Sequence, residues 1–299
     1  MRLTRQRLIR LLPMLCLGLS AVTPGCNSHP DLGPRVTDIP AGGSPLPTRL
    51  VDGLWIVRAQ LPNLDRKQTL LLDTGTDRTL LDLQLARRIG LGMSGETNVR
   101  SATGRVLPST SLDRLPWLVA GKATFRDIEV AGIDLQPLRR ASGLPIQGIL
   151  GCDLFRQCLL ELDYRRRQAR VLPPAEAPDQ EAHHFSKRLP WVTITAANQE
   201  IRALVDTGFQ DALAVPPTTS LPWQTAPRPD GELATLQGPS DKEVGRLAGN
   251  IECGEIVRRN PLVVVSPGSP KIGTAILRRC RWLLDTGGGR LWMQPYRRR

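Results

Sequence analysis

The chain is poor in aromatic residues. They make up 4% of its 299 residues, while 40 Lys and Arg against 28 Asp and Glu leave a net charge of +12. Basic pairs such as 258–259 have no aromatic side chains interleaved with them. Proteins that bind single-stranded nucleic acid place stacking aromatic rings along a basic groove. We therefore expect no nucleic-acid partner, and we interpret the charge as a property of the surface.

Histidine is also scarce, and the cysteines are not spaced as zinc ligands. In the body of the chain Cys152 and Cys158 are six residues apart, Cys253 and Cys280 are isolated, and residues 183–184 are adjacent histidines. Tetrahedral zinc sites use a different ligand spacing. We expect no metal and no cofactor. The four body cysteines either form disulfides, with three complete pairings open, or remain buried thiols.

The N-terminal apolar run is too short for a confident membrane span. Leu11–Val22 is interrupted by Pro13 and falls short of the roughly 20 apolar residues that a spanning helix needs. Four arginines precede it and small residues follow it, which is the layout of an export signal. Residues 21–26 resemble a bacterial lipoprotein cleavage site. Residues 1–26 are therefore predicted to be a signal peptide with Cys26 as the lipidated residue; secretion with Cys26 merely near the cut is the alternative.

This interpretation places the protein outside the cytoplasm. We expect it to be exported, and either anchored to the cell envelope by the lipid or periplasmic. Residues 27–49 are rich in Pro and Gly and are predicted to be a tether, because such a composition cannot bury enough apolar surface to fold. An N-terminal lobe is predicted over 50–174, a linker over 175–188, and a C-terminal lobe with a basic tail over 189–299.

Two stretches of the body share one pattern. Residues 69–82 read TLLLDTGTDRTLLD, and residues 203–216 read ALVDTGFQDALAVP. In each, an apolar run typical of a buried strand ends in an acid, and the Gly two residues later allows a tight turn. The acids Asp73 and Asp206 are 206 − 73 = 133 residues apart. The two copies therefore indicate two halves of one duplicated chain.

A second pair of segments repeats in the same order. Residues 148–163 and 272–285 each run from a Gly-containing apolar stretch, through a short helix-like segment, to an apolar strand that ends in an acid. Gly151 and Gly273 are 273 − 151 = 122 residues apart, and Asp163 and Asp285 have the same separation. After the first acid, the pattern within 80–91 predicts a short amphipathic helix that ends at Gly90.

An Asp-Thr-Gly loop after an apolar strand, followed by a Gly-containing unit and present twice, resembles the aspartic peptidases of the pepsin and retropepsin type. The segment 203–216, with Phe209 after its Asp-Thr-Gly, is similar to bacterial retropepsin-like proteins. The resemblance covers about 50–295 and implies a mostly β fold: a duplicated, two-lobed acid-protease β-barrel with short helices and a cleft between the lobes. A monomer would supply both acids; two copies pairing lobe by lobe is the alternative.

The chemistry of this family explains why two acidic loops are needed. Peptide hydrolysis without a metal or a covalent nucleophile needs one ionised carboxylate to deprotonate a water and one protonated carboxyl to protonate the carbonyl oxygen. Two carboxyls that lie close together share one proton, since both cannot ionise at low cost. Asp73 and Asp206 are the candidate catalytic pair. The resemblance assigns supporting roles in the two loops to Thr74, Gly75, Thr76, Thr207 and Gly208.

These supporting roles differ in kind. The resemblance implies that Thr74 and Thr207 form hydrogen bonds that lock the two loops together. The two glycines are expected to keep the backbone close behind the acids, where a side chain would collide. Thr76 can donate a hydroxyl to a carboxylate and its counterpart Phe209 cannot, so the two acids are not expected to be equivalent.

Hairpins that close over the substrate are a further feature of the family. Candidate flap residues are Thr103 and Gly104 in the first half and Gln237 and Gly238 in the second; ordinary polar turns are the alternative. A third Asp-Thr-Gly at 285–287 aligns with the end of a late strand and is predicted to be a hairpin turn.

Together these features predict an aspartic endopeptidase that acts on exported or envelope proteins, with a peptide or protein as substrate. The alternative is a catalytically inactive, retropepsin-like envelope lipoprotein that uses the same cleft to bind peptides.

Overall fold

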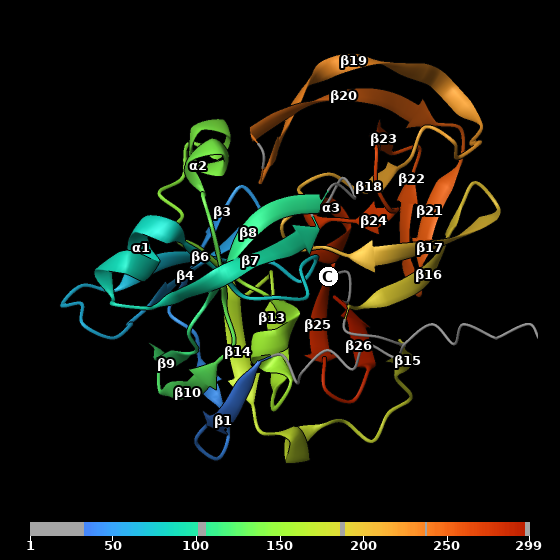
Figure 1. Ribbon diagram of the computed structural model, residues 1–299. Helices are drawn as coiled ribbons and strands as arrows, with labels where there is room; N and C mark the ends of the chain where they lie inside the picture. The colour runs from blue at the N-terminus through green and yellow to red at the C-terminus, as the bar shows by residue number, and fades with distance from the viewer. Residues whose placement is uncertain (1–32, 101–105, 186–188, 237, 297–299) are drawn as a thin grey trace, which may run out of the picture. The chain divides into compact units, whose positions relative to one another are not determined.

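The computed structural model describes residues 33–100, 106–185, 189–236 and 238–296, and all of them belong to one compact unit, Leu32–Arg299. The predicted signal peptide and Cys26 lie outside the described residues. Within those residues there are 26 strands and three α-helices, the helices being α1 (Leu83–Arg88), α2 (Gln136–Ser142) and α3 (Thr274–Leu277). This confirms the prediction of a mostly β protein with short helices (Figure 1).

The first half of the chain forms an eight-stranded sheet with the order β3-β4-β5-β12-β6-β11-β8-β7. Strand β5 carries the apolar run before Asp73 and pairs with β4 and β12, and its leucines 70–72 are buried because both faces of the sheet are covered: Leu70 and Leu72 belong to one apolar cluster and Leu71 to another. The strands are β3 (Thr48–Val51), β4 (Leu54–Ala59), β5 (Gln68–Leu72), β6 (Leu80–Asp82), β7 (Met93–Arg100), β8 (Val106–Leu112), β11 (Ala131–Ile133) and β12 (Gly148–Leu150).

The second half forms a nine-stranded sheet with the order β19-β20-β23-β18-β24-β17-β16-β21-β22. Strand β17 ends one residue before Asp206. The strands are β16 (Trp191–Ala196), β17 (Gln199–Val205), β18 (Leu213–Val215), β19 (Trp223–Thr235), β20 (Gly238–Leu247), β21 (Asn250–Cys253), β22 (Ile256–Arg259), β23 (Leu262–Val265) and β24 (Lys271–Ile272).

The two sheets share their central pairing scheme. In the first, β5 pairs in parallel with β12, β12 antiparallel with β6, and β6 in parallel with β11. In the second, β17, β24, β18 and β23 follow one another with the same alternation. Each acid therefore leaves its sheet at an equivalent place, at the end of a central strand.

A six-stranded sheet joins the two halves, with the order β15-β26-β25-β13-β14-β2. Strand β13 (Leu159–Asp163) of the first half pairs antiparallel with β25 (Cys280–Asp285) of the second, and Glu161 lies opposite Leu283. The remaining strands are β2 (Ser44–Pro45), β14 (Gln168–Leu172), β15 (His183–His184) and β26 (Arg290–Pro295). Two 3₁₀ helices, η1 (Cys152–Phe155) and η2 (Pro174–Glu176), precede β13 and follow β14.

Ordered strands begin well before residue 50, so the tether predicted over 27–49 does not extend to residue 49. Strand β1 (Pro34–Asp38) pairs with β10 (Ala123–Ile128), which pairs with β9 (Leu115–Ala120), while β2 and β3 join the larger sheets. Pro34 and Pro45 fit these strands because β1 and β2 lie at sheet edges, where a missing N–H breaks no inner ladder. The lobe and linker boundaries themselves remain predictions.

Three local predictions can be compared with the structure. Helix α1 lies within the predicted 80–91, is N-capped by Asp82, and is followed by Gly90 at φ +78°. The third Asp-Thr-Gly lies in the hairpin between β25 and β26, where Asp285 pairs with Arg290, which confirms the predicted turn. The four body cysteines are buried free thiols rather than disulfides. No helix in the described ranges is long and apolar enough to cross a membrane.

Candidate functional site

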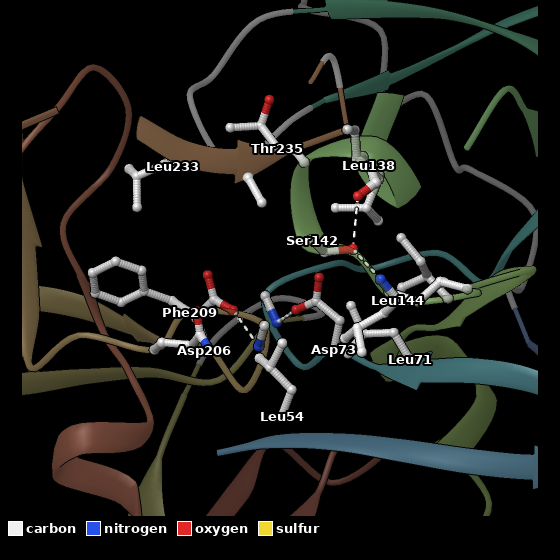
Figure 2. Close-up of a pocket in the computed structure, with 18 of the residues that line it drawn as sticks. Leu54, Leu71, Asp73, Leu138, Ser142, Leu144, Asp206, Phe209, Leu233 and Thr235 are labelled. Atoms are coloured by element: carbon white, nitrogen blue, oxygen red, sulfur yellow. Dashed lines mark hydrogen bonds between the residues drawn. The ribbon is translucent and has the colours of Figure 1, made fainter. Parts of the chain in front are cut away.

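The two Asp-Thr-Gly loops lie face to face. The N–H of Gly75 donates to the Oδ1 of Asp73, and the N–H of Gly208 donates to the Oδ1 of Asp206, each over 2.8 Å. A Cβ added at Gly75 would lie 2.6 Å from the Cγ of Asp206, and one added at Gly208 would lie 2.8 Å from the Cγ of Asp73. Each glycine is therefore packed against the carboxyl of the opposite loop, and any larger residue would collide with it. Figure 2 shows the two acids on adjacent loops.

The threonines of the loops form a reciprocal set of hydrogen bonds between the halves. The Thr74 hydroxyl donates to the carbonyl oxygen of Val205 over 2.7 Å and accepts the N–H of Thr207 over 3.2 Å. The Thr207 hydroxyl donates to the carbonyl oxygen of Leu72 over 2.9 Å and accepts the N–H of Thr74 over 3.0 Å. Both side chains are buried. These four bonds hold the acids in register across two sheets that are distant in sequence.

The environment of Asp73 strongly favours its protonated form. Burial, first, and then the neighbouring charge of Asp206 raise the pKa of Asp73 from 3.8 to about 8, and a side-chain hydrogen bond with Asp206 acts in the same direction. The N–H of Gly75 and the charge of Lys271 oppose the increase. Burial disfavours a charged carboxylate, and a second carboxylate close by adds repulsion. The pair is thus suited to holding one proton near neutral pH.

The acids line a cavity of about 350 Å³. Apolar side chains of the first half, including Leu54, Leu71 and Ile149, form part of its wall, and Phe209 and Leu233 of the second half face them. Figure 2 shows Asp73 and Asp206 on one side of this cavity and Leu233 and Thr235 on the other. Such a cavity can accommodate an apolar side chain of an extended ligand next to the two acids.

A long hairpin of the second half covers the cavity. It consists of β19 and β20, and its tip lies against α2 of the first half (Figure 1). Leu236 packs on the apolar cluster of the first half that includes Leu54 and Leu71, and the Thr235 hydroxyl donates to the carbonyl oxygen of Gly238 over 2.8 Å. Gly238 therefore lies at this tip, while Gln237, Thr103 and Gly104 lie outside the described residues.

Residues 57–154 match the family model described as aspartyl protease. They include Asp73 and its loop. This part of the chain is similar to the aspartyl protease family. No curated protein matches the chain.

The matched segment ends before the second loop, so the placement of Asp206 rests on the geometry above. The structure brings together Asp73, Thr74, Gly75, Thr207, Gly208 and Asp206, as the sequence predicted, although their functional roles stay predictions. Thr76 lines the cavity, but its hydroxyl donates to the carbonyl oxygen of Arg78 over 3.5 Å. The Thr76 hydroxyl was expected to donate to a carboxylate, and in the structure it donates to a backbone carbonyl instead.

One charged residue of the site was missed by the sequence reasoning. Lys271 in β24 lines the cavity with its Nζ 3.4 Å from the Oδ2 of Asp206. The 122-residue offset aligns Lys271 with Ile149 of the first half, because 271 − 122 = 149, and an apolar counterpart gives no signal of a charged site residue. Within the described ranges, no group of three or more His, Cys, Asp and Glu is arranged to hold a metal ion.

Proposed function

We propose that this chain is an aspartic endopeptidase in which Asp73 and Asp206 act as one catalytic pair. The observation that carries the proposal is the packing of each acid against the glycine of the opposite loop, inside a cavity lined by both halves. The raised pKa of Asp73, about 8, supports it, because one carboxyl of the pair must be protonated while the other is ionised.

The reaction would proceed without a covalent intermediate. The ionised carboxylate removes a proton from a water, whose oxygen forms a bond to the carbon of the scissile carbonyl. The protonated carboxyl donates its proton to the carbonyl oxygen, which gives a neutral tetrahedral diol. The carboxyl that took the proton from water then donates it to the leaving nitrogen as the C–N bond breaks. One hydroxyl of the diol gives its proton to the other carboxylate, so the pair again holds one proton. Covering of the cavity by the β19–β20 hairpin would limit access of bulk water.

We further propose that the two halves are lobes of a duplicated acid-protease fold. The shared pairing scheme of the two sheets supports this. So does the register of β13 and β25: Glu161 lies opposite Leu283, and 283 − 161 = 122, the offset of the sequence repeat. Equivalent residues face each other where a twofold axis would pass. One chain then supplies both acids, and a homodimer is not needed to complete the site.

Substrate and location follow from the predicted export signal. We propose that the protein is exported, is anchored to the envelope through Cys26 or is periplasmic, and cleaves exported or envelope proteins. Metabolic labelling with palmitate tests the anchor: the wild-type chain should incorporate label and Cys26→Ala should not. Equal labelling of the two chains would refute lipidation at Cys26.

The catalytic proposal is tested with the full chain and an unfolded protein substrate over acidic to neutral pH. Wild type should cleave it, and Asp73→Asn and Asp206→Asn should each abolish cleavage. Asp285→Asn is the matched control, since it alters the same tripeptide motif in the β25–β26 hairpin, and it should retain activity. If wild type and both loop variants behave alike, the proposal is wrong.

Binding of a peptide without cleavage is the second candidate, because the cavity and its apolar wall suit that function as well. A pepstatin-type transition-state mimic separates the two functions. It should bind tightly, in a pH-dependent manner and with a requirement for Asp73, if the chain is an enzyme. Binding that Asp73→Asn leaves unchanged would favour the inactive peptide-binding module.

A further inference from the structure

Lys271 lies in an unusual environment for a lysine. Its side chain is 10% exposed, and its Nζ lies 3.4 Å from the Oδ2 of Asp206 and 5.2 Å from the centroid of the Phe209 ring. A buried ammonium group is costly unless it is paired. The carboxylate of Asp206 supplies the pairing charge, and the face of Phe209 adds a cation–π contact.

The same place in the first half carries no charge. Ile149 of β12 and Lys271 of β24 are 271 − 149 = 122 residues apart and both line the cavity. Strand β12 pairs in parallel with β5, which leads to Asp73, as β24 pairs with β17, which leads to Asp206. Asp73 therefore has an isoleucine at the position where Asp206 has an ammonium group. The two acids differ through this exchange.

Other charged groups face the same cavity. Lys242 of β20 forms an ion pair with Asp211, with 3.6 Å between its Nζ and the Oδ2, and Glu232 and Asp52 also line the wall. Lys242 is thus paired with an acid outside the two loops. Of the ion pairs recorded for the described residues, the one that involves a catalytic candidate is Lys271 with Asp206.

We propose that Lys271 is a positioning residue that keeps the negative charge of the catalytic pair on Asp206 and the shared proton on Asp73. This rests on the proposed function and deepens it, since it assigns Asp206 as the base that activates the water and Asp73 as the acid that protonates the carbonyl oxygen. The ammonium group stabilises every state in which the pair is ionised. Lys271 accordingly sets the pH range in which the pair holds one proton.

The first test is the pH dependence of kcat/KM for the full chain. Lys271→Met keeps the length of the side chain and removes its charge, so both limbs of the profile should move to higher pH by about 1 to 3 units. Lys271→Arg restores a positive charge and should return the limbs toward wild type. Lys122→Met removes the same charge from an exposed turn and should leave the profile unchanged. Limbs that stay in place in folded Lys271→Met would overturn the proposal.

The second test does not require activity. Carbon-13 NMR of the full chain labelled at the aspartate carboxyls follows each acid directly, and Asp73→Asn and Asp206→Asn assign the two signals. When the pair holds one proton, Asp206 should show the ionised shift and Asp73 the protonated shift, and Lys271→Met should reduce this difference. A proton found on Asp206 in wild type would overturn the role of Lys271. If the carboxyl signals show the expected shifts but the chain does not cleave protein, the endopeptidase function is refuted and the role of Lys271 is not.

Discussion

Replacing Thr74 by valine tests whether the reciprocal threonine bonds hold the two halves together. The substitution keeps the shape of the side chain and removes the hydroxyl of a residue that is 1% exposed. Two hydrogen bonds are lost, to the carbonyl oxygen of Val205 and from the N–H of Thr207. At about 1 kcal/mol each, with about 1 to 3 kcal/mol more for leaving the Thr207 N–H buried without its acceptor, the expected loss is about 3 to 5 kcal/mol.

A loss of that size is a large fraction of the stability of a folded domain, which is about 5 to 15 kcal/mol. Equilibrium unfolding in urea measures it, with the midpoint and the slope compared for wild type and variant. Thr193→Val, on an exposed position of β16, is the matched control and should stay within about 0.5 kcal/mol of wild type. A loss below about 1 kcal/mol for Thr74→Val at unchanged slope would refute the reasoning.

Three further predictions concern the acids, the glycines and the hairpin. The pKa of Asp73 is raised from 3.8 to about 8, so its contribution to stability is fully present below about pH 4 and declines as the pH rises through 8. The urea midpoint, measured at pH 4, 6 and 8, should therefore depend less on pH in Asp73→Asn than in wild type. An equal dependence on pH in the two proteins would contradict this. Gly208→Ala places a Cβ 2.8 Å from the Cγ of Asp73 and should displace that acid, which lowers kcat about 100-fold. Steady-state kinetics measures the change, and a wild-type kcat would contradict the prediction. Leu236→Ala removes an apolar contact of about 1.5 kcal/mol between the hairpin tip and the first half. Because this contact holds the hairpin over the cavity, kcat/KM should fall roughly tenfold. An unaltered kcat/KM would show that catalysis does not need the hairpin in this position.

Short-range patterns in the sequence were sufficient to predict the local elements. The apolar run 70–72, the following acid and Gly75 predict a strand followed by a tight turn, since apolar runs and turn residues are local signals. Helix α1 and the β25–β26 hairpin were predictable for the same reason. The 122-residue offset indicated a repeat but did not predict that β13 pairs with β25, which the structure shows with Glu161 opposite Leu283.

Tertiary structure decided what depends on contacts between distant segments. The prolines of 34–47 suggested a tether, yet the strands β1 and β2 in this range are stabilised by partners that lie up to 171 − 44 = 127 residues ahead in the chain. The position of the hairpin tip on α2 depends on how the halves pack, and no local pattern encodes it. The ammonium group of Lys271 beside Asp206 is the clearest case: composition places a lysine in the chain, but only the fold buries it 3.4 Å from a carboxylate, where electrostatic energies are several times larger than in water.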